Sequence, residues 1–299
     1  MASLYTQQSK NVFRTWVLMT VFLLLVVGIG WFASYYFNSA IILYIAIAIA
    51  LVMNVWAYWF SDKIAIRQAR AIPADENQYK QLHRIVENLA ITAGLPKPRV
   101  YIIEDPAPNA FSSGRDKNHA VIAVTTGLLG MMDENELQGV IAHELSHVGN
   151  RDILVMSAAV VLVGVISVLA NIFLRVSFFG GFGGRDRNGG NVFVLIAGVI
   201  AIILAPIAAT LIELAISRKR EFLADASGAL LTRYPEGLES ALQKLGNYQA
   251  PMKSASTATA HMYITNPFGA HPAGQWIQKI FSTHPPIPAR IAALEGMNV

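Results

Sequence analysis

The chain has 299 residues, of which 54% are hydrophobic and 14% are charged, and its mean hydropathy is +0.44. Because soluble proteins carry about a quarter charged residues, this composition excludes an ordinary soluble protein and favours a membrane protein with a polar part attached. The net charge of +4 is too modest to indicate a nucleic-acid partner, and we expect none. The chain has no cysteine, so any metal ion must be bound by His, Asp or Glu.

The first two hydrophobic segments, residues 15–36 and 40–60, contain no charged residue. Each reaches the roughly 20 apolar residues that are needed to cross a bilayer. They follow each other so closely that residues 1–62 are predicted to form an N-terminal transmembrane hairpin. We interpret the first segment as an uncleaved anchor, because a second span follows it at once.

Residues 63–152 are polar and are predicted to fold as a small α+β unit on the cytoplasmic side. A stripe of apolar residues predicts a helix over 77–92. The β-rich runs at 99–103 and 120–126 predict strands, and the stretch "PAPNAFSSG" between them is turn-rich.

A helix with unusual polar content follows, in the stretch "GVIAHELSHVGNRD". Asp133 is its expected N-cap, and Glu136 completes a capping-box pattern. His143 and His147 are four residues apart, so they lie on one helix face and can reach a single ion. Glu144 follows His143 and lies about 100° further around the helix axis, so it can contact a water on that ion without being a ligand. This H-E-x-x-H pattern is typical of zinc peptidases with a glutamate base.

A second hydrophobic pair, residues 153–174 and 192–212, flanks the glycine-rich stretch "RVSFFGGFGGRDRNGG". Residues 153–216 therefore predict a second transmembrane hairpin, giving four hydrophobic helices. Basic residues flanking the spans place both termini and the polar parts in the cytoplasm. Arg175, Arg185 and Arg187 disagree with this orientation, so the second pair has an alternative in which it packs against protein; we favour spanning.

Residues 217–299 are predicted to complete the cytoplasmic part. Two histidines leave a catalytic zinc ion one protein ligand short, and Glu221 in "REFLAD" is the best remaining candidate. Asp225 shares its helix face and can accept the second N–H of a ligating imidazole. The alternative is a solvated acidic pair that balances the adjacent basic residues. A membrane hairpin over 153–216 would bring His147 and Glu221 together.

Four stretches, "PNAFSSG…HAVIAVTTGLL", "DENELQGVIAHELSHVGNRD", "SRKREFLADA" and "STHPPIPARIAAL", together resemble the HtpX family of bacterial membrane heat-shock metalloproteases. That family belongs to the superfamily of the CAAX prenyl proteases. The resemblance implies a mostly α-helical membrane protein with a small zincin-type catalytic domain. It implies one Zn²⁺ per chain, with His143, His147 and Glu221 as ligands, Glu144 as general base and Asp225 as partner of an imidazole.

The resemblance also implies a substrate-binding edge strand that contains Asn109, Ala110 and Phe111. His284 and Arg290 fall on family positions near the active site, where they are expected to stabilise the oxyanion or bind substrate. On the sequence alone, His284 could equally be a turn residue and Arg290 a surface charge.

The resemblance implies a stress-response endopeptidase that cleaves unfolded or damaged membrane proteins in the bacterial cytoplasmic (inner) membrane. A membrane scaffold or metal sensor that uses the same histidine pair is the competing class. A transporter fits less well, because Glu213 is the one ionisable residue close to a span interior. The substrates and the oligomeric state stay open. The remaining histidines are expected to be surface or hydrogen-bonding residues: His83, His119, His261 and His271.

Overall fold

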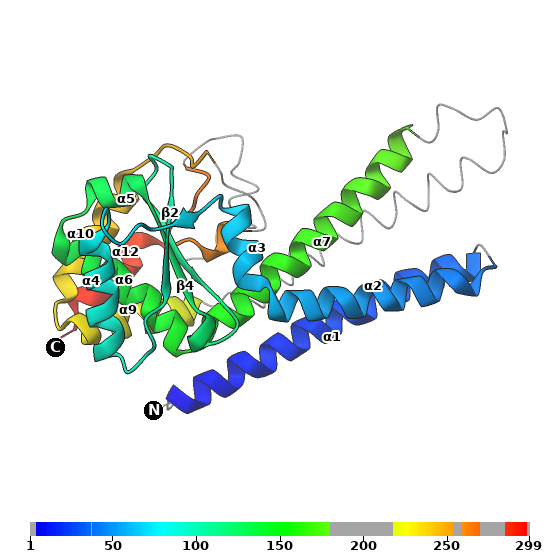
Figure 1. The fold of residues 1–299 in the computed structure, drawn as a ribbon, viewed down its shortest axis with the longest axis horizontal. Helices are drawn as coiled ribbons and strands as arrows, with labels where there is room; N and C mark the ends of the chain where they lie inside the picture. The colour runs from blue at the N-terminus through cyan, green and yellow to red at the C-terminus, as the bar shows by residue number, and fades with distance from the viewer. Residues whose placement is uncertain (1–3, 37, 180–217, 254–258, 270–284, 298–299) are drawn as a thin grey trace.

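The computed structural model describes residues 4–36, 38–179, 218–253, 259–269 and 285–297. Long helices extend from one side of a mixed helix–sheet part, and the N-terminus lies back beside that part (Figure 1). The fourth hydrophobic segment, 192–212, lies outside the described residues, as do His271 and His284.

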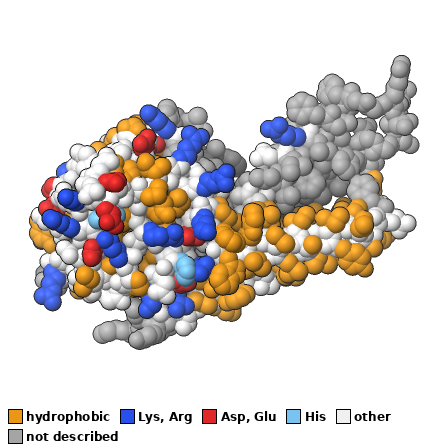
Figure 2. Space-filling view, in the orientation of Figure 1, with side chains coloured by type: hydrophobic (Ala, Val, Ile, Leu, Met, Phe, Trp, Pro, Cys, Tyr) orange, Lys and Arg blue, Asp and Glu red, His pale blue; other side chains and the backbone are white. Residues whose placement is uncertain are grey.

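The first hairpin consists of α1 (Leu4–Tyr36) and α2 (Ala40–Trp59), which lie side by side (Figure 1). Both are long and apolar enough to cross a membrane. Gly30 allows their close approach, since a Cβ atom there would lie 2.2 Å from the Ala46 Cβ. Hydrophobic side chains predominate on the visible face of the hairpin, whereas charged side chains gather mainly on the mixed part (Figure 2). Such a large apolar surface fits contact with lipid.

The helix α6 (Glu134–Gly149) turns sharply into α7 (Asp152–Phe179). The bend is 83°, and Arg151 at the corner has a left-handed backbone with φ +58°. Apolar residues of α7 pack against α1 and α2, with Val155 and Leu162 among Leu18 and Phe22. If α6 and α7 form one bent span, the described residues contain three candidate membrane spans; otherwise they contain two.

A four-stranded sheet forms the centre of the mixed part, in the order β1-β2-β4-β3. Its strands are β1 (Ile72–Pro73), β2 (Arg99–Ile103), β3 (Ala110–Ser113) and β4 (Val121–Thr125). The strands β2 and β4 are parallel, and the other two pairs are antiparallel. The predictions of β2 and β4 are confirmed. The edge strand β3 lies inside the stretch whose composition indicated turns.

The other helices of the mixed part pack around the sheet or against α6: α3 (Ser61–Gln68), α4 (Lys80–Thr92), α5 (Thr126–Met131), α9 (Arg218–Thr232), α10 (Pro235–Asn247) and α12 (Ile287–Glu295). Two 3₁₀ turns, η1 (Lys117–His119) and η2 (Ala260–Met262), lie in loops. The core joins Val86 of α4, Val124 of β4 and Ile141 of α6. The capping box at Asp133 and Glu136 is confirmed, so the start of α6 is fixed locally. Because α6 packs against α4, α9 and α10, its inner face is shielded from water.

Candidate metal centre

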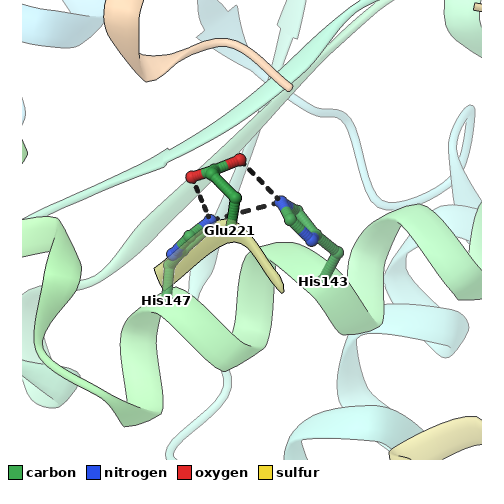
Figure 3. A group of neighbouring side chains, drawn as sticks. All are labelled: His143, His147 and Glu221. Atoms are coloured by element: carbon green, nitrogen blue, oxygen red, sulfur yellow. Dashed lines mark hydrogen bonds and ion pairs between the residues drawn. The ribbon is translucent and has the colours of Figure 1, made fainter. Parts of the chain in front are cut away.

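Two histidines of α6 and one glutamate of α9 point towards a common point (Figure 3). The Nε2 atoms of His143 and His147 are 3.2 Å apart. The carboxylate oxygens of Glu221 lie 3.9 Å from His143 Nε2 and 3.6 Å from His147 Nε2. All three residues are at most 4% exposed. Residues that are far apart in the sequence therefore form one candidate metal site.

The other ring nitrogen of each histidine contacts a carboxylate. His143 Nδ1 lies 2.9 Å from Asp225 Oδ1, and His147 Nδ1 lies 3.0 Å from Asp152 Oδ2. A carboxylate acceptor holds the ring proton on Nδ1, which leaves the Nε2 lone pairs facing each other beside Glu221. Two such nitrogens and a carboxylate, buried within 4.8 Å of one another, can bind one cation. Two imidazole nitrogens and a carboxylate also form a common ligand set of catalytic zinc, so the residues fit such an ion.

Negatively charged side chains surround His147 and affect its protonation. Burial by itself favours the neutral imidazole. The hydrogen bond to Asp152 and the charge of Glu221 oppose it and raise the pKa of His147 to about 9. The same field attracts a metal cation, which competes with the proton for the ring nitrogen.

Glu144 lies next to His143 on α6 and is 1% exposed. Its Oε2 accepts a hydrogen bond of 2.7 Å from Ser112 Oγ on the edge strand β3. This bond holds the carboxylate between the histidine pair and the strand. A buried carboxylate in that position can exchange a proton with a molecule bound at the metal site.

Arg290 of α12 is fully buried and binds Asp225 through two bonds. Its Nε donates to Asp225 Oδ2 at 2.8 Å, and its Nη2 donates to Asp225 Oδ1 at 2.6 Å. A third bond, from Nη1, goes to the carbonyl of Ile264 at 3.1 Å. Although burial alone raises the pKa of Asp225, the charge and bonds of Arg290 lower it, so Asp225 stays ionised beside His143.

Comparison with known proteins decides the family. The family model described as "Peptidase family M48" matches residues 76–298. The chain belongs to peptidase family M48. Proteins named "Protease HtpX homolog" from Caldanaerobacter subterraneus subsp. tengcongensis and Thermoanaerobacter pseudethanolicus are 48% and 47% identical to it over 302 residues. These alignments cover 99% of each chain, and they confirm the resemblance read from the motifs.

A crystal structure of Ste24p from S. mikatae has a similar fold, with a TM-score of 0.50 and 19% sequence identity. The match covers 93% of this chain and 62% of that chain. With the two candidate spans, the M48 family and the candidate metal site, the chain is a membrane metalloendopeptidase.

In this M48 peptidase, the expected substrate strand lies at the sheet edge, where residues of a later segment already contact it. The side-chain Nδ2 of Asn109 donates to the carbonyl of Thr265 at 3.0 Å. Ala110 accepts a backbone hydrogen bond of 3.0 Å from Ile264. The ring of Phe111 packs edge-on against Tyr263, with centroids 5.3 Å apart. All three expected residues are buried.

The sequence patterns alone left two contacts of the M48 site unassigned. Asp152 binds His147, and Ser112 binds Glu144. Asp152 had a usable signal, since a ligating histidine needs an acceptor for its second N–H and Asp152 ends the same motif. Three further histidines make other contacts: His83 with Ala74, His119 with Asp116 and Arg115, and His261 with Met156.

Proposed function

We propose that this M48 peptidase is a zinc-dependent endopeptidase of the bacterial cytoplasmic membrane that hydrolyses misfolded or damaged membrane proteins. The observation that carries the proposal is the buried cluster of the two histidine Nε2 atoms and the Glu221 carboxylate, next to Glu144. Protein quality control is supported by the protease HtpX name of relatives that match nearly the whole chain.

His143, His147 and Glu221 are the proposed ligands of one Zn²⁺ per chain. Three protein ligands are typical of catalytic zinc and leave one position for water or substrate. When bound, zinc supplies Lewis acidity, which polarises a carbonyl group and acidifies water. Asp225 and Asp152 fix the tautomers of the two imidazoles, and Arg290 keeps Asp225 ionised and oriented.

Glu144 is the proposed general base. It accepts the proton of the attacking water and then delivers that proton to the leaving amine. The hydrogen bond from Ser112 holds its carboxylate towards the strand along which a substrate would lie. Glu144 is buried, so bulk solvent does not screen its carboxylate. The electrostatic interaction of this carboxylate with charge that develops at the scissile bond is therefore stronger than it would be in water.

An extended substrate segment is proposed to bind along β3, in the region of Asn109, Ala110 and Phe111. The Ala110 carbonyl is directed away from β4, towards Ile264. In the alternating antiparallel pattern, Ser112 directs its backbone groups to that same side. Because the Ala110 carbonyl already accepts from Ile264, the added substrate strand is proposed to pair at Ser112, which would bring a peptide past Glu144. His284 is the proposed cationic donor to the oxyanion.

The membrane arrangement completes the proposal. We propose that residues 1–62 and 153–216 form two transmembrane hairpins and that residues 63–152 and 217–299 form the catalytic part in the cytoplasm. The apolar surface of α1 and α2 supports the first hairpin. The sharp bend between α6 and α7 supports a catalytic helix that lies at the membrane surface.

Replacement of the base tests this function. We expect purified full-length Glu144→Gln to retain bound zinc and to lose at least about 100-fold in the rate of casein cleavage, the lower end of general-base effects. Glu134→Gln is the matched control, because Glu134 lies on the same helix and is exposed. Unchanged turnover of the Glu144 variant would refute the base and favour a non-enzymatic metal protein.

A further inference from the structure

The first membrane helix reaches the end of the metal-binding helix through a buried amide. Asn11 of α1 is 1% exposed. Its Nδ2 donates to the Asn150 carbonyl at 2.9 Å and to Asp152 Oδ1 at 2.7 Å. Gln8, one turn earlier, donates to the Gly149 carbonyl at 2.7 Å. The start of α1 is therefore bonded to the corner between α6 and α7.

Asp152 connects this amide to the metal centre. While its Oδ1 accepts from Asn11, its Oδ2 contacts His147 Nδ1 at 3.0 Å. A carboxylate with both oxygens bound cannot rotate freely, so Asn11 fixes the plane in which Asp152 meets the imidazole. Asn11, Asp152 and His147 form a continuous buried chain from a membrane helix to a candidate metal ligand.

A second branch leads from the same amide towards Glu221. Arg220, the residue before Glu221, directs Nη1 to Asn11 Oδ1 at 3.3 Å and to Asp152 Oδ1 at 3.4 Å. Position 11 therefore needs a donor for Asp152 and an acceptor for Arg220 at once. A neutral amide supplies both, whereas an aspartate would place a second carboxylate against Asp152.

We propose that Asn11 is a positioning residue of the metal centre: through Asp152 it orients His147, so that the seating of α1 sets the affinity of the site for its cation. The inference rests on the proposed function, in which His147 is a ligand. Under this inference, the membrane hairpin anchors the protein and also helps to orient a metal ligand. Partners of metal-ligating histidines typically contribute 10-fold to 100-fold to metal affinity.

The test measures zinc affinity of the full-length protein in detergent by competition with a chromophoric chelator. We expect Asn11→Ala to weaken zinc binding about 10-fold to 100-fold. Gln8→Ala is the matched control, because it removes a hydrogen bond between α1 and the same corner without touching Asp152. We expect its zinc affinity to stay within about threefold of the parent, as for an amide that is not a histidine partner. Equal weakening in both variants would overturn the inference and assign α1 a merely structural role.

A double-mutant cycle with Asp152→Asn tests whether Asn11 affects zinc binding through Asp152. If Asn11 acts through Asp152, the combined variant binds zinc no more weakly than Asp152→Asn alone. Effects that multiply would overturn the inference. Should Asn11→Ala fail to fold, Asn11→Ser is measured with the same expectations, since its shorter side chain does not reach Asp152. Glu144→Gln tests the proposed function without altering Asn11. Failure of the proposed function would appear as unchanged casein cleavage in Glu144→Gln, whereas failure of this inference would appear in the zinc affinities of the Asn11 variants.

Discussion

Gly228 of α9 lies directly against the backbone of His143 in α6: a Cβ atom at position 228 would lie 2.9 Å from the backbone nitrogen of His143. Gly228, Asp225 and Glu221 are spaced three and four residues apart, so they share one face of α9. The missing side chain lets this face approach the H-E-x-x-H helix closely. Helix packing thus sets the separation of the third candidate ligand from the histidine pair.

Gly228→Ala is expected to push α9 away from α6. Overpacking of this kind costs about 1–3 kcal/mol, and the shift also moves Glu221. We expect a lower melting temperature and weaker zinc binding, measured by circular dichroism and by chelator competition. Gly130→Ala is the control, because a Cβ atom at Gly130 would meet nothing within 4 Å. Equal behaviour of the two variants would contradict tight packing at the metal centre.

Removal of the proposed third ligand is expected to empty the site. With Glu221 replaced by alanine, two imidazoles hold zinc without a carboxylate to balance its charge. Elemental analysis after gel filtration should find about one zinc per chain in the parent and far less than one in Glu221→Ala, as the ligand set requires. The exposed Glu236, in the first turn of α10, provides the control Glu236→Ala. Full zinc content in the Glu221 variant would exclude this ligand.

Glu136 is expected to make stability depend on acidic pH. Its carboxylate accepts from Ser240 Oγ at 2.5 Å, from Lys244 Nζ at 2.6 Å and from the Asp133 backbone at 2.8 Å. Burial alone raises the pKa of Glu136, but these partners lower it below the ordinary 4.5. A lowered folded-state pKa means that this contribution is fully present above the unfolded pKa. It is lost as the pH falls through the folded value.

Glu136→Gln should therefore lower the free energy of unfolding by about 1–2 kcal/mol at pH 7 and by much less well below pH 4. Melting curves of the parent and the variant across this range measure the difference. A gap that stays constant with pH would mean that the charge of Glu136 contributes nothing. Exposed Glu134, on the same helix, supplies the control Glu134→Gln, for which we expect no comparable pH dependence.

Local rules predicted the parts of the site that lie within one helix. The spacing of His143 and His147, with the capping box at Asp133, needs only the geometry of α6. Glu221 was a candidate because two histidines leave a catalytic zinc ion one protein ligand short. Its proximity to His147 depended on the expectation that a hairpin over residues 153–216 brings the two segments together. Strand β3 was harder to predict, because all four of its residues are buried and it shows no alternation of polar and apolar positions.

Other contacts depend on a sharp turn of the chain or on the packing of distant helices. Asp152 reaches His147 because the chain turns by 83° at Arg151, and no periodicity encodes that corner. Asn11 lies in a helix whose composition indicates membrane insertion alone, yet it contacts the partner of a candidate ligand. The bond from Arg290 to Asp225 depends on the docking of α12 against α9.

The proposed function requires one zinc ion held by His143, His147 and Glu221. X-ray absorption at the zinc edge of the purified full-length protein tests it most directly. We predict nitrogen and oxygen ligands at about 2.0–2.2 Å, with outer scattering from two imidazoles, and an altered spectrum in Glu221→Ala. A spectrum without imidazole scattering, or one that Glu221→Ala leaves unchanged, would contradict this metal centre.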